Sequence, residues 1–160
     1  METRPAAAHD LQHLVDLRIA FLKDIYDTIT EKEISTMLAA LPDYYRAHLG
    51  KDFFAFLAFD GDIPVSAVYL LIVERPPNLH FITGKTCIFL NVYTDPAYRK
   101  RGFASALLSR AIEKARSMNV SCIELEATDA GAPVYQKLGF QCKQSQCVAM
   151  EYQFHTNCKP

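Results

Sequence analysis

The sequence predicts a mixed α/β domain, with a mostly antiparallel sheet flanked by helices and a central pair of parallel strands. Three observations point to this class. Two helical patterns open the chain, two apolar runs joined by Asp60-Gly61-Asp62 follow, and a strand–helix–strand pattern occupies residues 86–127. A tight hairpin makes its two strands antiparallel, whereas strands joined by a crossover helix run parallel. The order of elements therefore implies one mixed sheet with helices packed against it.

Two helices are expected before the first apolar strand. Apolar residues recur at mostly helical spacing over residues 10–24. Thr30 and Glu33 form a capping-box signature, which opens a second helix. Pro42 is expected to end that helix, because proline lacks an N–H and its ring clashes with the preceding turn. Residues 44–49 are then expected to form a separate helical stretch.

The rest of the chain favours strands and two further helices. Gly61 accepts the positive φ that a tight turn needs, so residues 53–59 and 63–73 are expected to form a hairpin. The later elements are expected to be a strand at 86–94, a helix at 102–118, a short strand at 122–127, a short helix at 130–138 and two closing strands.

Length and charge narrow the function classes. The chain has 160 residues, half of them apolar, and a formal net charge of −1. We expect one domain over residues 1–160, long enough to bury a core without a metal or disulfide. The near-neutral charge argues against nucleic-acid or membrane partners, and the sequence shows neither an apolar run of bilayer length nor an apolar secretion signal. A cytoplasmic protein is expected.

The five cysteines, at positions 87, 122, 142, 147 and 158, agree with that compartment. Their number is odd and they show no C-x-x-C spacing. A zinc site built from Cys142, Cys147, His155 and Cys158 can be imagined, but its spacing matches no usual zinc pattern. Reduced thiols and no metal site are the favoured interpretation.

The start of the helix at 102–118 has the features of an anion-binding site. The first amides of a helix lack intrahelical partners, and the helix dipole adds positive potential there. Gly102 has no Cβ and Ala104 a small side chain, while Arg99, Lys100 and Arg101 add charge. This pattern favours a phosphate or diphosphate ligand, although it is neither a P-loop nor a dinucleotide fingerprint. The alternative is that Gly102 merely starts a helix beside solvated basic residues.

Two motifs then carry a family resemblance. Arg99-x-x-Gly102-x-Ala104 resembles motif A, [QR]-x-x-G-x-[GA], of the GNAT superfamily of acyl-CoA-dependent N-acetyltransferases. It follows Tyr93-Thr94-Asp95-Pro96, which is similar to the end of the family's central strand. Tyr135-x-x-x-Gly139-Phe140 looks like the family's motif B. The resemblance spans essentially the whole chain and implies a GNAT-like sheet, in which the two central parallel strands splay and pantetheine inserts between them.

The resemblance also implies roles for the matching positions. The backbone of Val92 and Thr94 would pair with pantetheine, and an amide near Val92 would polarise the thioester carbonyl. Backbone amides from Lys100 to Ser105 would hold the CoA diphosphate. The complete set implied for acetyl-CoA is Val92, Tyr93, Thr94, Arg99, Lys100, Arg101, Gly102, Phe103, Ala104, Ser105 and Thr128, the last standing where relatives often carry an asparagine.

For proton transfer, the resemblance implies that Tyr135 is the general acid for the leaving CoA thiolate. The strand at 86–94 contains no acidic residue where some relatives place the base. Glu74 is our first candidate base, with Asn91 (as a positioner of water), Glu126 and Asp129 left open. An amine must lose a proton before it attacks, so a base or a water chain is required.

The function expected is acetyl transfer from acetyl-CoA to a primary amine of a small molecule or peptide, by direct attack in a ternary complex. No cysteine has a histidine at a spacing that indicates an acyl-enzyme. The main alternative is a non-catalytic module that senses acyl-CoA. A ribosome- or tRNA-associated protein is less favoured, because three basic residues in a near-neutral chain attract nucleic acid weakly. The apolar C-terminal region is suited to pairing across a homodimer.

The tyrosines of the two opening helices leave a further choice. Tyr26, Tyr44 and Tyr45 have the positions to line an acceptor pocket or to pack within the helices. Packing is the favoured interpretation.

Overall fold

A computed structural model describes residues 2–143, 148–152 and 154 of the chain. The chain divides into two units, Met1–Glu126 and Ala127–Pro160. The second unit contains α4 (Ala132–Lys137). The elements of the first unit are β1 (Glu2–Pro5), α1 (Leu11–Ile25), α2 (Glu31–His48), β2 (Phe53–Asp60), β3 (Ile63–Glu74), β4 (Lys85–Phe89), β5 (Tyr93–Thr94), α3 (Phe103–Ser117) and β6 (Ile123–Glu124), with short 3₁₀ turns at Ala8–Asp10 and Pro96–Tyr98. The single domain expected from the length stays a prediction.

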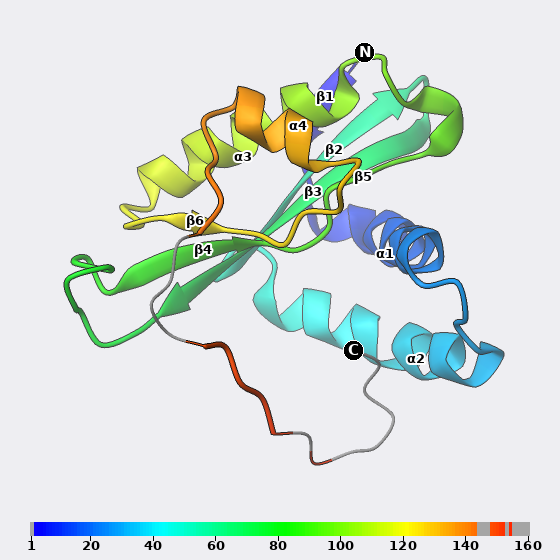
Figure 1. The fold of residues 1–160 in the computed structure, drawn as a ribbon. Coiled ribbons are helices and arrows are strands. Elements are labelled where there is room, and N and C mark those ends of the chain that lie inside the picture. Colours follow the sequence, from blue (N-terminus) through cyan, green and yellow to red (C-terminus); the bar gives the residue numbers. More distant parts are fainter. Residues whose placement is uncertain (1, 144–147, 153, 155–160) are drawn as a thin grey trace. The chain divides into compact units, whose positions relative to one another are not determined.

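A sheet in the order β1-β2-β3-β4-β6 forms the centre of the first unit, and β5 also pairs with β3 (Figure 1). Its described neighbours are antiparallel except β4 and β6, which run parallel. The mixed, mostly antiparallel sheet is therefore confirmed, as is the hairpin at Gly61, whose φ is 59°. The edge strand β1 was not expected from the sequence, because four residues that include Pro5 show no apolar alternation.

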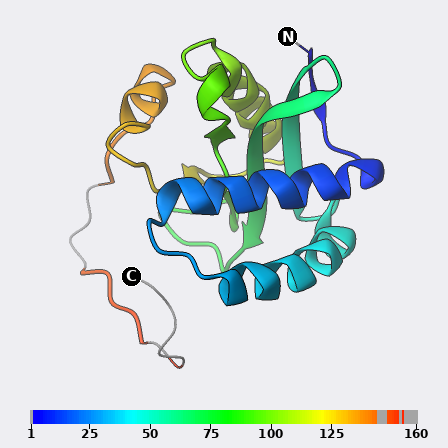
Figure 2. The ribbon, with the colours of Figure 1, turned by 90° about the vertical axis from the view of Figure 1, so that its right-hand side faces the viewer.

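Helices cover both faces of this sheet. Figures 1 and 2 show α1 and α2 on one face and α3 on the other. Successive side chains of a strand point to opposite faces, so β2 contributes to both layers. Ala55 and Leu57 join the core cluster on the α1 side, whereas Phe54 and Phe56 lie beneath the cationic side chains of Lys114 and Arg110 from α3.

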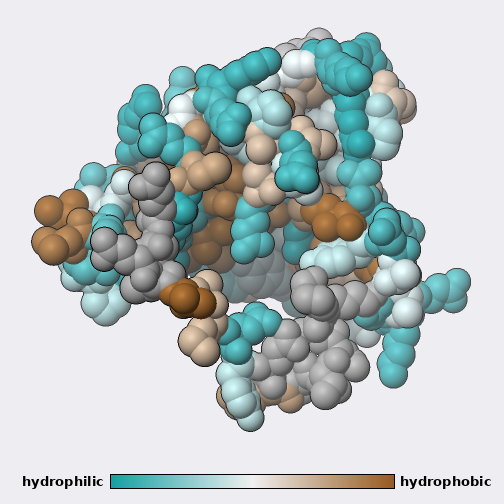
Figure 3. Space-filling view, viewed as in Figure 1, coloured by the Kyte–Doolittle hydropathy of each residue, from teal (hydrophilic) through white to brown (hydrophobic). Residues whose placement is uncertain are grey.

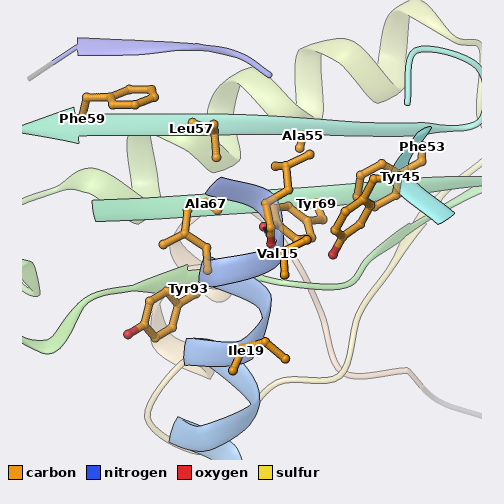
Figure 4. Close-up of a cluster of buried hydrophobic side chains, with 12 residues drawn as sticks. Val15, Ile19, Tyr45, Phe53, Ala55, Leu57, Phe59, Ala67, Tyr69 and Tyr93 are labelled. Carbon is orange, nitrogen blue, oxygen red and sulfur yellow. Dashed lines mark hydrogen bonds between the residues drawn. The ribbon is translucent and has the colours of Figure 1, made fainter. Parts of the chain in front are cut away.

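Aromatic side chains tie α1, α2 and the sheet together (Figure 4). The rings of Tyr45, Phe53 and Tyr69 contact one another, with centroids 5.1–6.0 Å apart. The buried hydroxyl of Tyr69 donates a hydrogen bond of 2.6 Å to the Leu14 carbonyl of α1. A buried phenol that has its partner adds apolar contact without an unsatisfied polar group. Packing is therefore confirmed for Tyr45.

The predicted helix break at Pro42 is wrong, because α2 continues through it to His48. A proline inside a helix costs about 3 kcal/mol through its missing hydrogen bond and its ring clash. Tyr45 lies one turn later and is only 2% exposed. Burial of so large a side chain contributes about 2–3 kcal/mol, which offsets most of that cost. The separate helical stretch at 44–49 is thus the last part of α2.

The strand predicted at 86–94 is present as β4 and β5, which are separated by a β-bulge. On β3, the partners of Phe89 and Tyr93 are Leu70 and Ala67. The chain therefore advances four residues from Phe89 to Tyr93, while β3 advances three from Ala67 to Leu70. One extra residue against a regular partner is the definition of a bulge, which bends the strand and leaves residues unpaired.

The connection between β3 and β4 carries exposed apolar side chains. Leu79 and Ile82 are 99% and 78% exposed, and Figure 3 shows brown side chains at the outer end of this connection. The backbone is nevertheless ordered locally, since the Asn78 carboxamide oxygen accepts hydrogen bonds from the N–H groups of His80 and Phe81. Gly84 closes a turn at the end of this connection, with a φ of 69° and a hydrogen bond from its N–H to the Phe81 carbonyl.

The end of the chain differs most from expectation. The described residues of 138–143, 148–152 and 154 contain no strand, so the two closing strands are not found there. The remaining positions, 144–147, 153 and 155–160, lie outside the described residues. The predicted helix at 130–138 and strand at 122–127 are present but shorter, as α4 and β6. No helix in the described part of the chain combines the length and apolar character needed to cross a membrane.

A partly buried ion pair joins β1 to the residue that precedes α1, and we therefore expect the stability of the protein to depend on Asp10. The Asp10 carboxylate is 1% exposed, accepts two 2.7 Å hydrogen bonds from Arg4 and a third from the Ala7 N–H. The Arg4 guanidinium lowers the pKa of Asp10 to about 2. We expect Asp10→Asn to lower the free energy of unfolding at pH 7 by about 2–3 kcal/mol in urea titrations.

The pH dependence provides a second readout. A carboxyl whose pKa is lowered by folding stabilises the protein above its unfolded pKa, and this contribution is lost as the pH falls toward the folded pKa. The difference between wild type and Asp10→Asn should therefore shrink between pH 4 and pH 2. Asp43→Asn is the control, because Asp43 is 83% exposed in its pair with Arg46 and should change stability by less than about 0.5 kcal/mol. Equal effects of the two substitutions contradict the prediction.

Candidate functional site

The turn that joins β5 to α3 has an unusual backbone. Asp95 opens it by accepting a hydrogen bond from the Ala97 N–H. Lys100 and Gly102 then adopt left-handed conformations, with φ values of 62° and 87°. A Cβ on Gly102 would meet no heavy atom within 4 Å, so the space above this glycine is open. The turn therefore presents backbone without a covering side chain at the N-cap of α3.

Backbone donors in this turn have no internal partners. The first hydrogen bond of α3 runs from the Ala106 N–H to the Gly102 carbonyl. In the described part of the chain, the N–H groups from Lys100 to Ser105 donate no hydrogen bond. Successive unpaired N–H groups in a turn form a concave anion site, and the dipole of α3 strengthens it. This arrangement can hold a phosphate or diphosphate.

The three basic residues of the turn differ in what they do. Lys100 and Arg101 are exposed and form no ion pair within the described residues, and Arg101 lies over the Tyr98 ring at 5.1 Å. Arg99 instead donates to the Asp24 carboxylate of α1 at 2.6 Å and to the Thr94 carbonyl at 3.1 Å. The hydrogen bond that Arg99 donates to Asp24 raises the pKa of Arg99. Arg99 thus fastens the turn to α1, whereas the other two leave their charge available.

An unpaired stretch of strand lies just before this turn. The parallel pairing of β4 with β6 ends at Ile88 and Glu124. Within the described residues, the backbone N–H and C=O groups of Asn91 and Val92, in the bulge, form no hydrogen bond. Tyr93 is held from the other side by Ser66, whose hydroxyl donates to its carbonyl. An extended polar ligand can therefore pair with Val92 as a strand would.

A buried polar pair lies at the same bulge. Asn91 is fully buried, and its carboxamide oxygen accepts a 3.4 Å hydrogen bond from the Arg18 guanidinium. The Asn91 amide nitrogen has no partner within the described part of the chain. Arg18 was missed by the sequence analysis, although a signal was present. It occupies a helical-repeat position of the apolar face of α1, between Leu14 and Leu22.

The structure does not bring Glu74, the first candidate base, to the bulge. Glu74 ends β3 opposite Lys85, and the two side chains form an ion pair of 3.3 Å. Lys85 begins β4, so Asn91 lies roughly 20 Å further along that strand at ~3.3 Å per residue. The Glu74 side chain is 76% exposed. Its contacts are those of an exposed cross-strand ion pair.

Tyr135 and Thr128 belong to the second unit. Tyr135 lies in α4, where its ring contacts Phe140 edge-on at 5.9 Å. Burial raises the pKa of the Tyr135 phenol above its usual value. The Thr128 carbonyl accepts hydrogen bonds from Gly131 and Ala132, and its hydroxyl accepts another from Gly131. Thr128 therefore shapes the turn that leads into α4, and its hydroxyl hydrogen is left to donate.

Most of the residues considered above as zinc ligands lie outside the described residues. Among the described residues, no cluster of three or more His, Cys, Asp or Glu side chains is arranged to hold a metal ion. Of the imagined zinc ligands only Cys142 is described, and it is exposed. Cys147, His155 and Cys158 lie outside the described residues.

Comparison with known proteins places these features in context. The model of the acetyltransferase (GNAT) family matches residues 19–140. A predicted acetyltransferase from Clostridium acetobutylicum, solved with acetyl-CoA, is similar with a TM-score of 0.80 and 25% identity, over 94% of this chain and 95% of its own. The comparison with curated proteins found no match.

Two further structures share the fold. A GCN5-related N-acetyltransferase from Ralstonia eutropha has a TM-score of 0.78 and 24% identity, over 93% of this chain and 97% of its own. An aminoglycoside 6'-N-acetyltransferase from Acinetobacter haemolyticus has a TM-score of 0.68 and 17% identity, over 97% of this chain and 100% of its own. At these identities, the similarity shows a shared fold.

The left-handed conformation of Lys100 predicts a stabilising substitution. A non-glycine residue in this conformation costs about 1–2 kcal/mol, which glycine avoids at a smaller entropic cost. We expect Lys100→Gly to raise the free energy of unfolding by about 0.5–1 kcal/mol in urea titrations. Lys32→Gly, at an exposed position of α2, should instead lower it by about 0.5–1 kcal/mol. A loss of stability in both variants is the opposing result.

Proposed function

The chain belongs to the acetyltransferase (GNAT) family, and from this premise we propose that it transfers an acetyl group from acetyl-CoA to a primary amine. The observation that carries the proposal is the run of unpaired N–H groups from Lys100 to Ser105 at the start of α3. The amine attacks the thioester directly in a ternary complex. The acceptor belongs to the small-molecule or peptide amines.

The diphosphate of CoA is the ligand proposed for the turn. Its oxygens accept hydrogen bonds from the backbone of Lys100–Ser105, and Gly102 lets the ligand approach because it has no Cβ. The exposed side chains of Lys100 and Arg101 add attraction. Phe103 is buried and secures the first turn of α3, so its contribution is through its backbone. Arg99 acts as a positioning residue, through its contacts with Asp24 and Thr94.

Pantetheine is proposed to lie along the bulge. Its amide groups would pair with the open backbone at Val92, and Tyr93 and Thr94 are held on the other side by Ser66 and Ala67 of β3. The Val92 N–H then faces the thioester carbonyl. A donor already fixed in place stabilises the oxyanion that develops during attack without a reorganisation cost.

Tyr135 is proposed as the general acid that protonates the departing CoA thiolate. Its raised pKa keeps the phenol protonated at neutral pH. A thiol with a pKa of about 8.5 leaves readily, so the acid assists the step without being essential to it. The Thr128 hydroxyl is proposed to contact the pantetheine arm. Direct proton transfer requires hydrogen-bond reach or one bridging water, so at ~20 Å from the bulge Glu74 is too far to take the proton of the amine, which passes to solvent water instead.

Gly102→Ala tests the diphosphate site. The new Cβ stands over the unpaired N–H groups, so we expect the Kd for CoA in titration calorimetry to rise by about 10-fold or more. Gly61→Ala is the matched control, because Gly61 also has a positive φ and open space around it, but lies in the β2–β3 turn. It should carry a similar strain and leave CoA affinity unchanged. Absence of any heat on titrating CoA into the wild type would overturn the proposed function.

Tyr135→Phe tests the acid. Loss of the phenol proton should reduce kcat by about 10- to 100-fold with little change in the Kd for acetyl-CoA, since the acid acts only as the thiolate leaves. The measurement is release of free CoA, followed with a thiol reagent across a panel of amines. Tyr152→Phe, at an exposed position of the second unit, is the control. Acetyl-CoA binding without CoA release with any amine would instead indicate a sensor of acyl-CoA.

A further inference from the structure

The Arg18 guanidinium is a half-buried cation without an anionic partner. It lies on the sheet-facing side of α1, between the buried residues Leu14 and Leu22. Within the described residues it forms no ion pair, unlike Arg4, which is matched with a carboxylate. Charged groups withdrawn from water are usually paired, because desolvation is otherwise uncompensated. Arg18 therefore has an unused capacity to bind an anion.

Its present contacts use only part of that capacity. One terminal nitrogen donates both hydrogen bonds, to the Leu90 carbonyl at 3.5 Å and to the Asn91 carboxamide at 3.4 Å. Both distances are long compared with the usual ~2.9 Å. The other two nitrogens of the guanidinium donate no hydrogen bond within the described residues, while the group lies over the Phe21 ring at 5.4 Å. A guanidinium has five donors in a planar fork, which suits two carboxylate oxygens.

Asn91 supplies an independent observation at the same place. A guanidinium only donates hydrogen bonds, so the Asn91 oxygen must face Arg18 and its nitrogen must point elsewhere. That nitrogen is buried and has no partner in the described part of the chain. An unsatisfied buried donor costs about 1–3 kcal/mol, and an acceptor oxygen of a ligand removes this cost once the bulge adjusts to admit it. The Arg18 guanidinium and the Asn91 amide nitrogen, both at the bulge, thus each lack a hydrogen-bond acceptor.

We infer that Arg18 binds a carboxylate of the acceptor, so that the acceptors are amines which carry a carboxylate a few bonds from the amino group. This inference rests on the proposed function. Asn91 orients the guanidinium and adjoins Val92, the residue proposed to face the thioester. Consecutive Cα atoms lie about 3.8 Å apart, so a carboxylate at Arg18 places a nearby amino group within reach of the thioester carbon. α-Amino acids are the simplest acceptors that fit.

Binding of reaction products tests the inference without requiring turnover. The midpoint of thermal unfolding is measured with CoA and the N-acetyl derivatives of the common α-amino acids, each compared with its carboxamide. We expect the acids to raise the midpoint of the wild type more than the carboxamides do, and Arg18→Met to abolish the difference. Arg18→Lys should retain part of it, because an ammonium keeps the charge without the fork.

Two further variants separate charge from packing. Asn91→Asp places a carboxylate beside Arg18, which should occupy the guanidinium and remove the preference for acids. Lys23→Met removes another cation of α1, at an exposed position, and should leave the preference intact. In CoA-release assays, Arg18→Met should lower kcat/KM for amino acids by about 10- to 100-fold and change that for their carboxamides by much less.

The outcomes distinguish this inference from the proposed function. If CoA binds but the carboxamides and the acids shift the unfolding midpoint equally, the assignment of Arg18 is overturned and the acetyltransferase proposal stands. The same conclusion follows if no acid shifts the midpoint. If Arg18→Met only lowers the unfolding midpoint and changes no ligand's effect, Arg18 merely joins α1 to the bulge, and the inference is again overturned. A failure of CoA itself to bind removes the proposed function.

Discussion

The extra residue between Phe89 and Tyr93 is the constraint on which the candidate site depends. β3 pairs with β4 on one side of this bulge and with β5 on the other, so the backbone between them must leave the regular ladder. Pairing with β6 has already ended at Ile88, and the unpaired groups of Asn91 and Val92 remain at the edge. A regular strand would have satisfied these groups internally and left no place for a strand-like ligand.

Helix α1 links the bulge to the helix start that follows it. Arg18 reaches the bulge, and Asp24 holds Arg99 of the turn, at positions about 9 Å apart along the helix axis. Between and around these residues, α1 buries apolar side chains against the sheet (Figure 4). The core therefore fixes the distance between the two places where backbone donors are unpaired. A rigid support of this kind keeps ligand-binding groups oriented before the ligand arrives.

Local signals succeeded where one interaction dominates. The capping box at Thr30 forms as expected, with both reciprocal hydrogen bonds, and Gly61 turns the hairpin. They failed where distant residues compete with local preference. Pro42 predicts a helix end, but burial of Tyr45 against Phe53 and Tyr69 carries α2 through it. The edge strand β1 forms because β2 offers it a partner, although its own four residues show no strand pattern.

The sequence by itself determined the mixed sheet, the hairpin, the helix α3 and the glycine at its start, because each follows from spacing or from the conformational range of one residue. Its motifs also sufficed to indicate the acetyltransferase family. Only the tertiary structure decided the register that produces the bulge. It also decided that Arg99 pairs with Asp24 while Lys100 and Arg101 do not, and that Glu74 lies opposite Lys85, the residue of β4 farthest from the bulge. These depend on which strands and helices meet, since hydrogen-bond partners far apart in the chain are chosen by packing and not by local preference.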